Sequence, residues 1–316
     1  MNMKILLFAN QNWGKLCVER LLAAGEQVVG LVTDEPAEQK SWYSSLWEVG
    51  KKHGLPVLHS VRIKDEMKAI AGFAPDLIVS IGFRQIFPAE IVRLPSWGCI
   101  NLHGSLLPKY RGHAPINWAI IQGEKETGVT VHYINEGVDT GDIILQEAIP
   151  IYDSDTALEV YERALPLYPQ LLSEAIQLIK TNQVQSIKQR PEEGFYCCRR
   201  YPKDSQINWQ RQTASEVHNF VRALAGPYPH AFTYHKGKKI LITRTSIPQK
   251  IFLGPPGRVG YKIKDQVIIL CKDRGLQIEK IKLEEGEELA PATIFTVGDD
   301  VGEKLSAGDV ETDQNK

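Results

Sequence analysis

Residues 101–142, NLHGSLLPKYRGHAPINWAIIQGEKETGVTVHYINEGVDTGD, decide how the rest of the chain is interpreted. Asn101 and His103 stand two residues apart at the end of an apolar run, and side chains two apart on a strand point to the same side. Asp139 lies in the turn-like segment GVDTG, which separates two further apolar runs. An amide donor, an imidazole and a carboxylate suit acyl transfer without a nucleophilic Ser or Cys. We therefore predict that Asn101, His103 and Asp139 share one cleft.

Each of these residues also has an ordinary structural explanation. An Asn at a strand end is usually a backbone cap, a loop His is usually solvated, and an Asp before Thr-Gly is usually a turn residue. Asp142 is a rival carboxylate three residues beyond Asp139, and His132, inside an apolar run, is expected to be structural. The combination of the trio with SLLPKYRG at 105–112 is what favours a functional interpretation.

The NLHGSLLPKYRG run resembles the signature of the folate-dependent formyltransferases. These include methionyl-tRNA formyltransferase, glycinamide ribonucleotide formyltransferase and the sugar-nucleotide N-formyltransferases. The run is most similar to the formyltransferase half of the bifunctional UDP-aminoarabinose enzyme, and the similarity extends from Lys4 to about Leu283. The resemblance implies 10-formyltetrahydrofolate as the co-substrate and a primary amine as the acceptor. The catalytic residues of this family match three residues here. The resemblance implies that Asn101 stabilises the oxyanion, that His103 transfers protons and that Asp139 supports the charged ring.

The resemblance also implies where the folate binds, mainly through main-chain atoms after the fourth strand and around the Asp loop. The matching positions are Gln85, Ile86, Phe87, His113, Asn135, Glu136, Gly137, Val138 and Asp139. His113 departs from the aminoarabinose enzyme, which has Arg there, so that contact is in doubt.

The acceptor amine is predicted from the loop after the second strand. Methionyl-tRNA formyltransferases usually carry an insertion there that is rich in Arg, Gly and Lys. Residues 33–45, TDEPAEQKSWYSS, are acidic and short instead, and resemble the aminoarabinose enzyme. We therefore expect a UDP- or dTDP-linked amino sugar, used in lipopolysaccharide or glycan biosynthesis. The substrate-contact candidates are Asn10, Tyr43, Lys109, Tyr110 and Arg111.

Three alternatives remain open. The first is methionyl-tRNA formyltransferase, with initiator tRNA as the acceptor. The second is a regulatory binding protein with an inactive site, which would not be expected to keep all three candidate catalytic residues. The third is formyltetrahydrofolate hydrolase, which usually carries an N-terminal regulatory domain, for which there is no room before Lys4. The sequence does not name the sugar, the carrier nucleotide or the oligomeric state, and a homodimer stays open.

Composition narrows the class of protein. The 316 residues carry a formal net charge of -1, which argues weakly against a protein that grips nucleic acid through phosphates. The five cysteines are scattered without zinc-ligand spacing, so we predict reduced thiols and no metal. No stretch approaches the roughly 18 apolar residues of a membrane span. The N-terminal apolar run is too short for a signal peptide. We expect a cytoplasmic protein with no membrane or nucleic-acid partner.

Alternating strands and helices predict an α/β fold with a Rossmann-like parallel sheet over residues 1–190. The predicted strands are 4–9, 28–33, 55–59, 76–83 and 99–103, followed by 129–134 and 143–149. The predicted helices are 14–24, 41–53, 64–73, 89–94, 114–122 and a long helix 156–180 kinked at Pro166 and Pro169. FANQNWG after the first strand lacks the G-x-G-x-x-G fingerprint, so an NAD enzyme is not expected.

The C-terminal third is expected to differ in class. A linker over 191–208 leads to a small β-barrel of the oligonucleotide-binding (OB) type over 209–298, as in the formyltransferases that the chain resembles. Its predicted elements are a helix over 213–224 and strands over 231–235, 239–245, 257–262, 266–270 and 276–283. We expect a scaffolding role for this barrel, whose actual role the sequence leaves open, and a disordered tail over 299–316.

Overall fold

The computed structural model describes residues 3–36 and 45–302, which form two compact units. The first unit comprises the described residues up to Ile116, together with Glu126–Pro150 and Tyr161–Arg199. The second comprises Asn117–Lys125, Ile151–Val160 and the described residues from Arg200 onward. Two segments that the sequence assigns to the first domain thus group with the second unit, and the boundaries at 190 and 208 stay a prediction.

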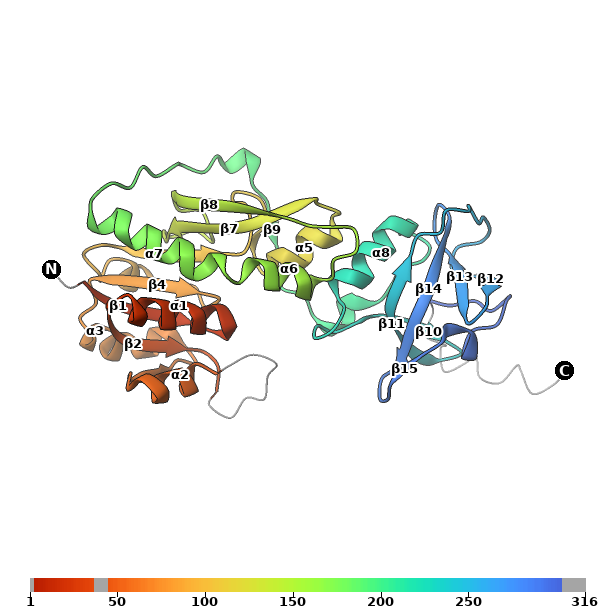
Figure 1. The fold of residues 1–316 in the computed structure, drawn as a ribbon, viewed down its shortest axis with the longest axis horizontal. Helices are drawn as coiled ribbons and strands as arrows, with labels where there is room; N and C mark the ends of the chain where they lie inside the picture. Colours follow the sequence, from red (N-terminus) through yellow and green to blue (C-terminus); the bar gives the residue numbers. More distant parts are fainter. Residues whose placement is uncertain (1–2, 37–44, 303–316) are drawn as a thin grey trace. The chain divides into compact units, whose positions relative to one another are not determined.

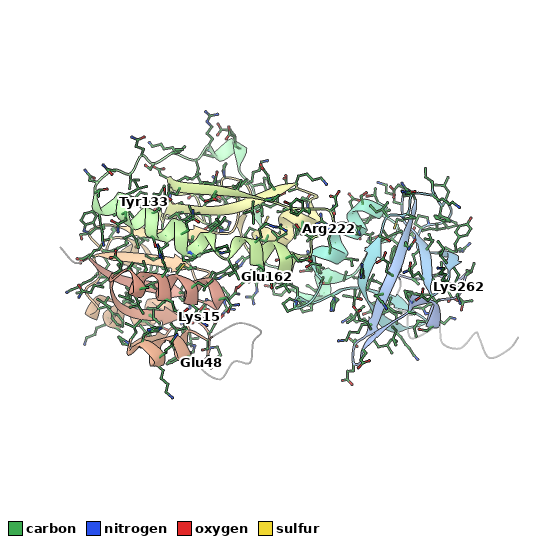
Figure 2. All side chains as sticks on the ribbon, in the orientation of Figure 1. Lys15, Glu48, Tyr133, Glu162, Arg222 and Lys262 are labelled. Carbon is green, nitrogen blue, oxygen red and sulfur yellow. The ribbon has the colours of Figure 1, made fainter. Side chains whose placement is uncertain are left out.

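Hydrogen bonds account for that grouping. Asn117 Nδ2 donates to Ala223 O at 2.7 Å, and Arg222 Nη1 donates to the carbonyl oxygens of Tyr152 and Asp155. Arg222, labelled in Figure 2, is buried, and these carbonyls replace the water that its guanidinium loses.

A seven-stranded mixed sheet forms the centre of the first unit (Figure 1). Its order is β3-β2-β1-β4-β5-β7-β8, parallel as far as β5 and antiparallel beyond it. The strands are β1 (Lys4–Ala9), β2 (Gln27–Thr33), β3 (Val57–His59), β4 (Leu77–Ile81), β5 (Cys99–His103), β7 (Glu126–Tyr133) and β8 (Ile143–Pro150). β4 is buried throughout, as expected of a parallel strand covered on both faces. The predicted α/β class is confirmed.

Helices cover this sheet, and two of them depart from the sequence prediction. The helices of the first part of the chain are α1 (Gln11–Ala23), α2 (Leu46–His53), α3 (Met67–Gly72), α4 (Ala89–Val92), α5 (Pro115–Ile121), α6 (Ala157–Ala164) and α7 (Leu167–Lys180). The predicted helix 156–180 is two helices, because Pro166 has no N–H to donate and interrupts the ladder. The predicted helix 64–73 begins as a 3-10 turn, Ile63–Glu66, before α3.

A short parallel ladder was not anticipated from the sequence. β6 (Arg111–Gly112) pairs with β9 (Tyr196–Cys197), and Arg111 N and His113 N donate to Phe195 O and Cys197 O. This ladder holds the loop that follows β5 against the segment that leaves the first unit. It therefore fixes the stretch of chain next to Asn101 and His103.

The second unit is built on a six-stranded antiparallel sheet with the order β10-β11-β14-β13-β12, and β15 pairs with β14. Its strands are β10 (Ala231–His235), β11 (Lys238–Ser246), β12 (Val259–Ile263), β13 (Gln266–Leu270), β14 (Gly275–Leu283) and β15 (Glu288–Leu289). Helix α8 (Ala214–Ala223) begins at a capping box formed by Thr213 and Glu216, and buries Val217 and Val221 in the core of this unit. An antiparallel C-terminal domain is confirmed, whereas its closure into an OB-type barrel stays a prediction.

Three short 3-10 turns complete the described elements: Pro191–Glu193, Pro202–Ser205 and Pro291–Thr293. Within residues 3–36 and 45–302, no helix has the length and apolar character needed to cross a membrane.

Candidate active site

Strands β5 and β7 bring Asn101 and His132 together. The two residues are direct partners in the antiparallel ladder, so their side chains stand on the same face of the sheet. Asn101 Nδ2 lies 3.2 Å from His132 Nε2. His103, two residues further along β5, projects on that face as well. The strand alternation used in the sequence prediction therefore holds here.

Asp139 reaches the same place from the turn after β7. Asn135 Oδ1 accepts hydrogen bonds from Gly137 N and Thr140 Oγ1, which closes the turn as an Asx-type loop. Asp139 itself has a φ of 51°, in the left-handed region that few non-glycine residues occupy. Its Oδ1 accepts from Asn101 Nδ2 at 3.2 Å, and its Oδ2 accepts from Gly112 N at 2.8 Å.

The ring of His103 is held between a carbonyl and this carboxylate. Nε2 lies 2.8 Å from Tyr110 O, and because a carbonyl only accepts, Nε2 carries the hydrogen. In the neutral ring the lone pair is then on Nδ1, which lies 3.5 Å from Asp139 Oδ2. A proton taken up at Nδ1 faces a carboxylate, which stabilises the charged ring. His103 is thus arranged to accept and return a proton at Nδ1.

His132 is fixed by the same kind of contact. Its Nδ1 lies 2.8 Å from the carbonyl oxygen of Tyr133, the last residue of β7, which is labelled in Figure 2. Nδ1 is therefore the donor, and Nε2 is left as an acceptor for Asn101 Nδ2. Sequence reasoning treated His132 as structural, and its position beside Asn101 could have been found only from the pairing of β5 with β7.

The surroundings of Asp139 favour the ionised form of its carboxylate. Burial by itself would raise its pKa, but the charge that His103 can carry and the hydrogen bond from Gly112 N–H hold the pKa below its ordinary value of 3.8. The rival Asp142 contributes its carbonyl oxygen to Tyr133 N, and Asp139 is the carboxylate that contacts Asn101 and His103.

The loop after β4, which the resemblance associates with folate, is anchored by its own Gln85 side chain to main-chain atoms of the segment after β3. Gln85 accepts from Ile63 N at 2.8 Å and donates to Ser60 O at 2.7 Å. Phe87 is buried against Phe8, whereas Ile86 is 72% exposed. The loop is therefore anchored at Gln85 and Phe87 and open to solvent between them.

Asn10 does not have the position predicted for a substrate contact. It is fully buried, and its amide donates to Asp34 Oδ1 and Gly82 O and accepts from Thr33 Oγ1. These three hydrogen bonds occupy the Asn10 amide inside the protein. They pair polar groups at the ends of three neighbouring strands, which would otherwise be buried without a partner. Asn10 thus ties strand ends together.

Arg111 is also corrected from a substrate contact to an internal one. It is buried, and its guanidinium donates to Gln189 Oε1 at 3.1 and 2.8 Å. Tyr110 is buried against Phe195, whereas Lys109 and His113 are exposed. Tyr43 lies outside the described residues.

The remaining predicted folate positions, Asn135 to Val138, form the exposed rim of the Asp139 turn. Glu136 is paired with Arg93 at 3.6 Å, and Val138 is 40% exposed. Within the described ranges, no group of three or more His, Cys, Asp or Glu side chains is placed to hold a metal ion.

The match to known families accounts for this arrangement. Residues 3–176 match the family model described as formyl transferase, and residues 200–297 match the model of the formyl transferase C-terminal domain. The chain belongs to the formyl transferase family. The first match covers more than half of the chain and contains Asn101, His103 and Asp139, so the expected relationship is confirmed.

Relatives in the formyl transferase family have differing names. The chain is 36% identical over 286 residues to methionyl-tRNA formyltransferase of Alkaliphilus oremlandii, with 89% of this chain and 92% of that protein covered. It is 32% identical to the bifunctional polymyxin resistance protein ArnA of Wigglesworthia glossinidia brevipalpis, covering 99% of this chain and 48% of that protein.

A solved structure is similar in fold. The N-formyltransferase from Helicobacter canadensis, in complex with folinic acid and dTDP-3-aminofucose, aligns with a TM-score of 0.68 at 23% identity. The alignment covers 88% of this chain and 99% of that one. At this identity the likeness establishes the fold, and the acceptor of this formyl transferase is a separate question.

Proposed function

We propose that this formyl transferase moves the formyl group of 10-formyltetrahydrofolate to the primary amine of a nucleotide-linked amino sugar. The proposal rests on one observation: His103 Nδ1 and Asn101, both near the end of β5, lie beside the carboxylate of Asp139. It offers a proton acceptor and an amide donor side by side. These are the groups that an amine attacking a formyl carbon needs.

Each step has a residue to support it. The amine nitrogen attacks the formyl carbon, and the former carbonyl oxygen becomes negatively charged. Asn101 Nδ2, whose present bonds at 3.2 Å are long, turns one hydrogen toward that oxygen. His103 Nδ1 takes a proton from the amine nitrogen and delivers it to N10 of the folate as the carbon–N10 bond breaks. Asp139 stabilises the charged ring between the two transfers.

The folate is proposed to lie along the loop 82–88 and the turn 135–139. The loop 82–88 follows β4, whose Ser80 pairs with Asn101 in the sheet, and the turn 135–139 carries Asp139, which contacts Asn101. The Helicobacter canadensis protein of similar fold was solved with folinic acid. The carrier nucleotide is proposed to be UDP or dTDP. The dTDP-3-aminofucose in that same complex supports dTDP as the carrier.

One experiment tests this function. Purified protein is incubated with 10-formyltetrahydrofolate and a panel of UDP- and dTDP-linked amino sugars, and products are identified by mass spectrometry. We expect N-formylation of at least one sugar, with His103→Ala and Asn101→Ala each losing about 10²-fold or more in kcat. No formylation of any sugar in the panel, or full activity in either variant, would refute the proposal.

A second candidate function is formylation of methionyl-tRNA, which the 36% identical relative favours. The acidic loop 33–45 and the net charge of -1 weigh against it, because tRNA binding draws on many cationic phosphate contacts. The same assay with charged initiator tRNA decides between them. Efficient transfer to tRNA, lost steeply as salt rises, would replace the sugar proposal.

A further inference from the structure

Gln189 joins two parts of the candidate site that are far apart in the sequence. Its Nε2 group donates to Asp139 O at 2.9 Å and to Gly141 O at 2.7 Å. Its Oε1 accepts two hydrogen bonds from the guanidinium of Arg111. The side chain therefore uses both of its amide hydrogens on the Asp139 turn and its oxygen on the loop after β5.

The backbone places Gln189 there by an irregular strand contact. Ile187 pairs with Ile143 in an isolated antiparallel bridge, with two reciprocal N–H to O hydrogen bonds of 2.8 Å. Ile143 begins β8, directly after the Asp139 turn. The segment that follows Ile187 thus runs beside that turn.

The stretch Tyr110–Gly112 is the common support of the catalytic groups. Tyr110 O holds His103 Nε2, and Gly112 N holds Asp139 Oδ2. Arg111, between them, holds Gln189, and Gln189 holds the main chain of Asp139. The carboxylate of Asp139 is therefore held directly by Gly112, and its backbone is held by Arg111 through Gln189.

Only an amide serves this position. Arg111 is buried and needs an acceptor, which Gln189 Oε1 supplies. Two backbone carbonyls of the turn need donors, which only the Nε2 end can supply. A carboxylate would satisfy the guanidinium but would face the two carbonyl oxygens without a hydrogen to donate.

We propose that Gln189 is a positioning residue, which keeps the Asp139 turn aligned with His103 for proton transfer. The consequence for transfer rests on the proposed formyl transfer function; the structural link does not. Asp139 holds a left-handed backbone conformation, which costs free energy and persists only where the surroundings enforce it. The two hydrogen bonds from Gln189 supply that enforcement.

Two variants and a control separate positioning from general stability. Gln189→Glu keeps an acceptor for Arg111 but removes both donors, and Gln189→Met removes every bond. The control is Thr233→Val, because Thr233 Oγ1 accepts a buried hydrogen bond from Trp209 Nε1 at 2.9 Å within the second unit, outside the loops around Asp139. Thermal unfolding of each variant reports whether it is folded.

The first readout needs no substrate. In amide and histidine ring NMR spectra, we expect the Gly112 N–H and the His103 ring signals to shift in Gln189→Glu and in Gln189→Met, and to stay in place in Thr233→Val. Unchanged Gly112 and His103 signals in both folded Gln189 variants would overturn the proposal. This result is independent of which acceptor the enzyme uses.

The second readout is the split between kcat and KM for whichever acceptor the wild type formylates. A turn displaced by about 1 Å costs about 10²-fold in rate, so we expect kcat of Gln189→Glu to fall by that order with KM nearly unchanged. An equal fall in Thr233→Val would reduce the effect to general loosening and overturn the proposal. A wild type that formylates no amino sugar refutes the proposed function alone, and the NMR result still decides the role of Gln189.

Discussion

Asn101 and His132 face each other across β5 and β7, with Asn101 Nδ2 at 3.2 Å from a ring nitrogen that can only accept. His132 Nδ1 is committed to the carbonyl of Tyr133, so the tautomer of a buried ring sets the direction in which the Asn101 amide points. The amide nitrogen is thereby kept on the side of Asp139 and His103.

This relationship predicts the behaviour of two substitutions at His132. His132→Leu removes the acceptor for Asn101, and we expect kcat to fall by about tenfold, the value of one hydrogen bond of about 1.4 kcal/mol. His132→Gln can place an oxygen near the position of Nε2, and we expect a smaller loss. Steady-state kinetics of the two variants decides, and equal losses would show that His132 acts through packing alone.

Asp139 predicts a change in acid stability. Its folded-state pKa is depressed below 3.8, so its contribution to stability is present above about pH 4 and is lost as pH falls toward the folded-state pKa. In Asp139→Asn this loss is absent, and we expect a flatter decline of unfolding free energy below pH 4 in urea titrations.

The control for that titration is Asp153→Asn. Asp153 also has a lowered pKa, from its hydrogen bond to Lys125, but it is 83% exposed. Solvent and salt screen such a pair, so the slope is expected to change little. A wild-type slope in Asp139→Asn would contradict the ionised, buried carboxylate described above.

We expect the ion pair of Arg84 with Asp34 to affect the KM for folate. Arg84 donates through Nε, Nη2 and its backbone N–H to the Asp34 carboxylate, which fixes the beginning of the loop 84–88. We expect Arg84→Met to raise the KM for 10-formyltetrahydrofolate several-fold while kcat changes less, because the loop is proposed to bind the co-substrate and not to take part in proton transfer.

A matched control exists in the second unit. Arg258 pairs with Asp300 through Nε and Nη2 and is 45% exposed, close to the 43% of Arg84. Arg258→Met loses an ion pair that solvent screens, because Asp300 is itself exposed, and should leave the KM for folate unchanged. A KM that rises equally in both variants would show that the Arg84 effect is not local.

Gly141 predicts a steric limit on the turn. A Cβ at this position would lie 1.7 Å from Tyr133 O, so any side chain forces the turn away from β7. We expect Gly141→Ala to cost about 1–3 kcal/mol of stability and most of the activity. Gly72→Ala, in α3, meets nothing within 4 Å and should be neutral or slightly stabilising in the same urea unfolding and activity assays.

The position of a residue could be predicted from the sequence where it depends on neighbours in the same strand or turn, and not where it depends on a segment far away in the chain. Asn101 and His103 were placed together because their spacing needs only the alternation of one strand. Strands β1, β10 and β13 have the predicted limits, since apolar runs bounded by turn residues leave little choice. Asp139 was placed from the family pattern, and its carboxylate does contact both partners.

The errors concern interactions between segments far apart in the chain. Asn10 looked like a polar residue at a strand end, yet its amide is consumed by Asp34, Gly82 and Thr33. Gln189 stood in a polar run with nothing to distinguish it from its neighbours. Its role depends on the bridge between Ile187 and Ile143, a pairing that no local pattern encodes.

The supports around Asp139 and His103 are largely main-chain atoms: Tyr110 O, Gly112 N and the carbonyl oxygens of Asp139 and Gly141. Substitutions at the exposed Lys109 and His113, within the same loop, leave every one of these atoms in place. The surface of this loop can therefore change in charge and size while the contacts that hold Asp139 and His103 are kept.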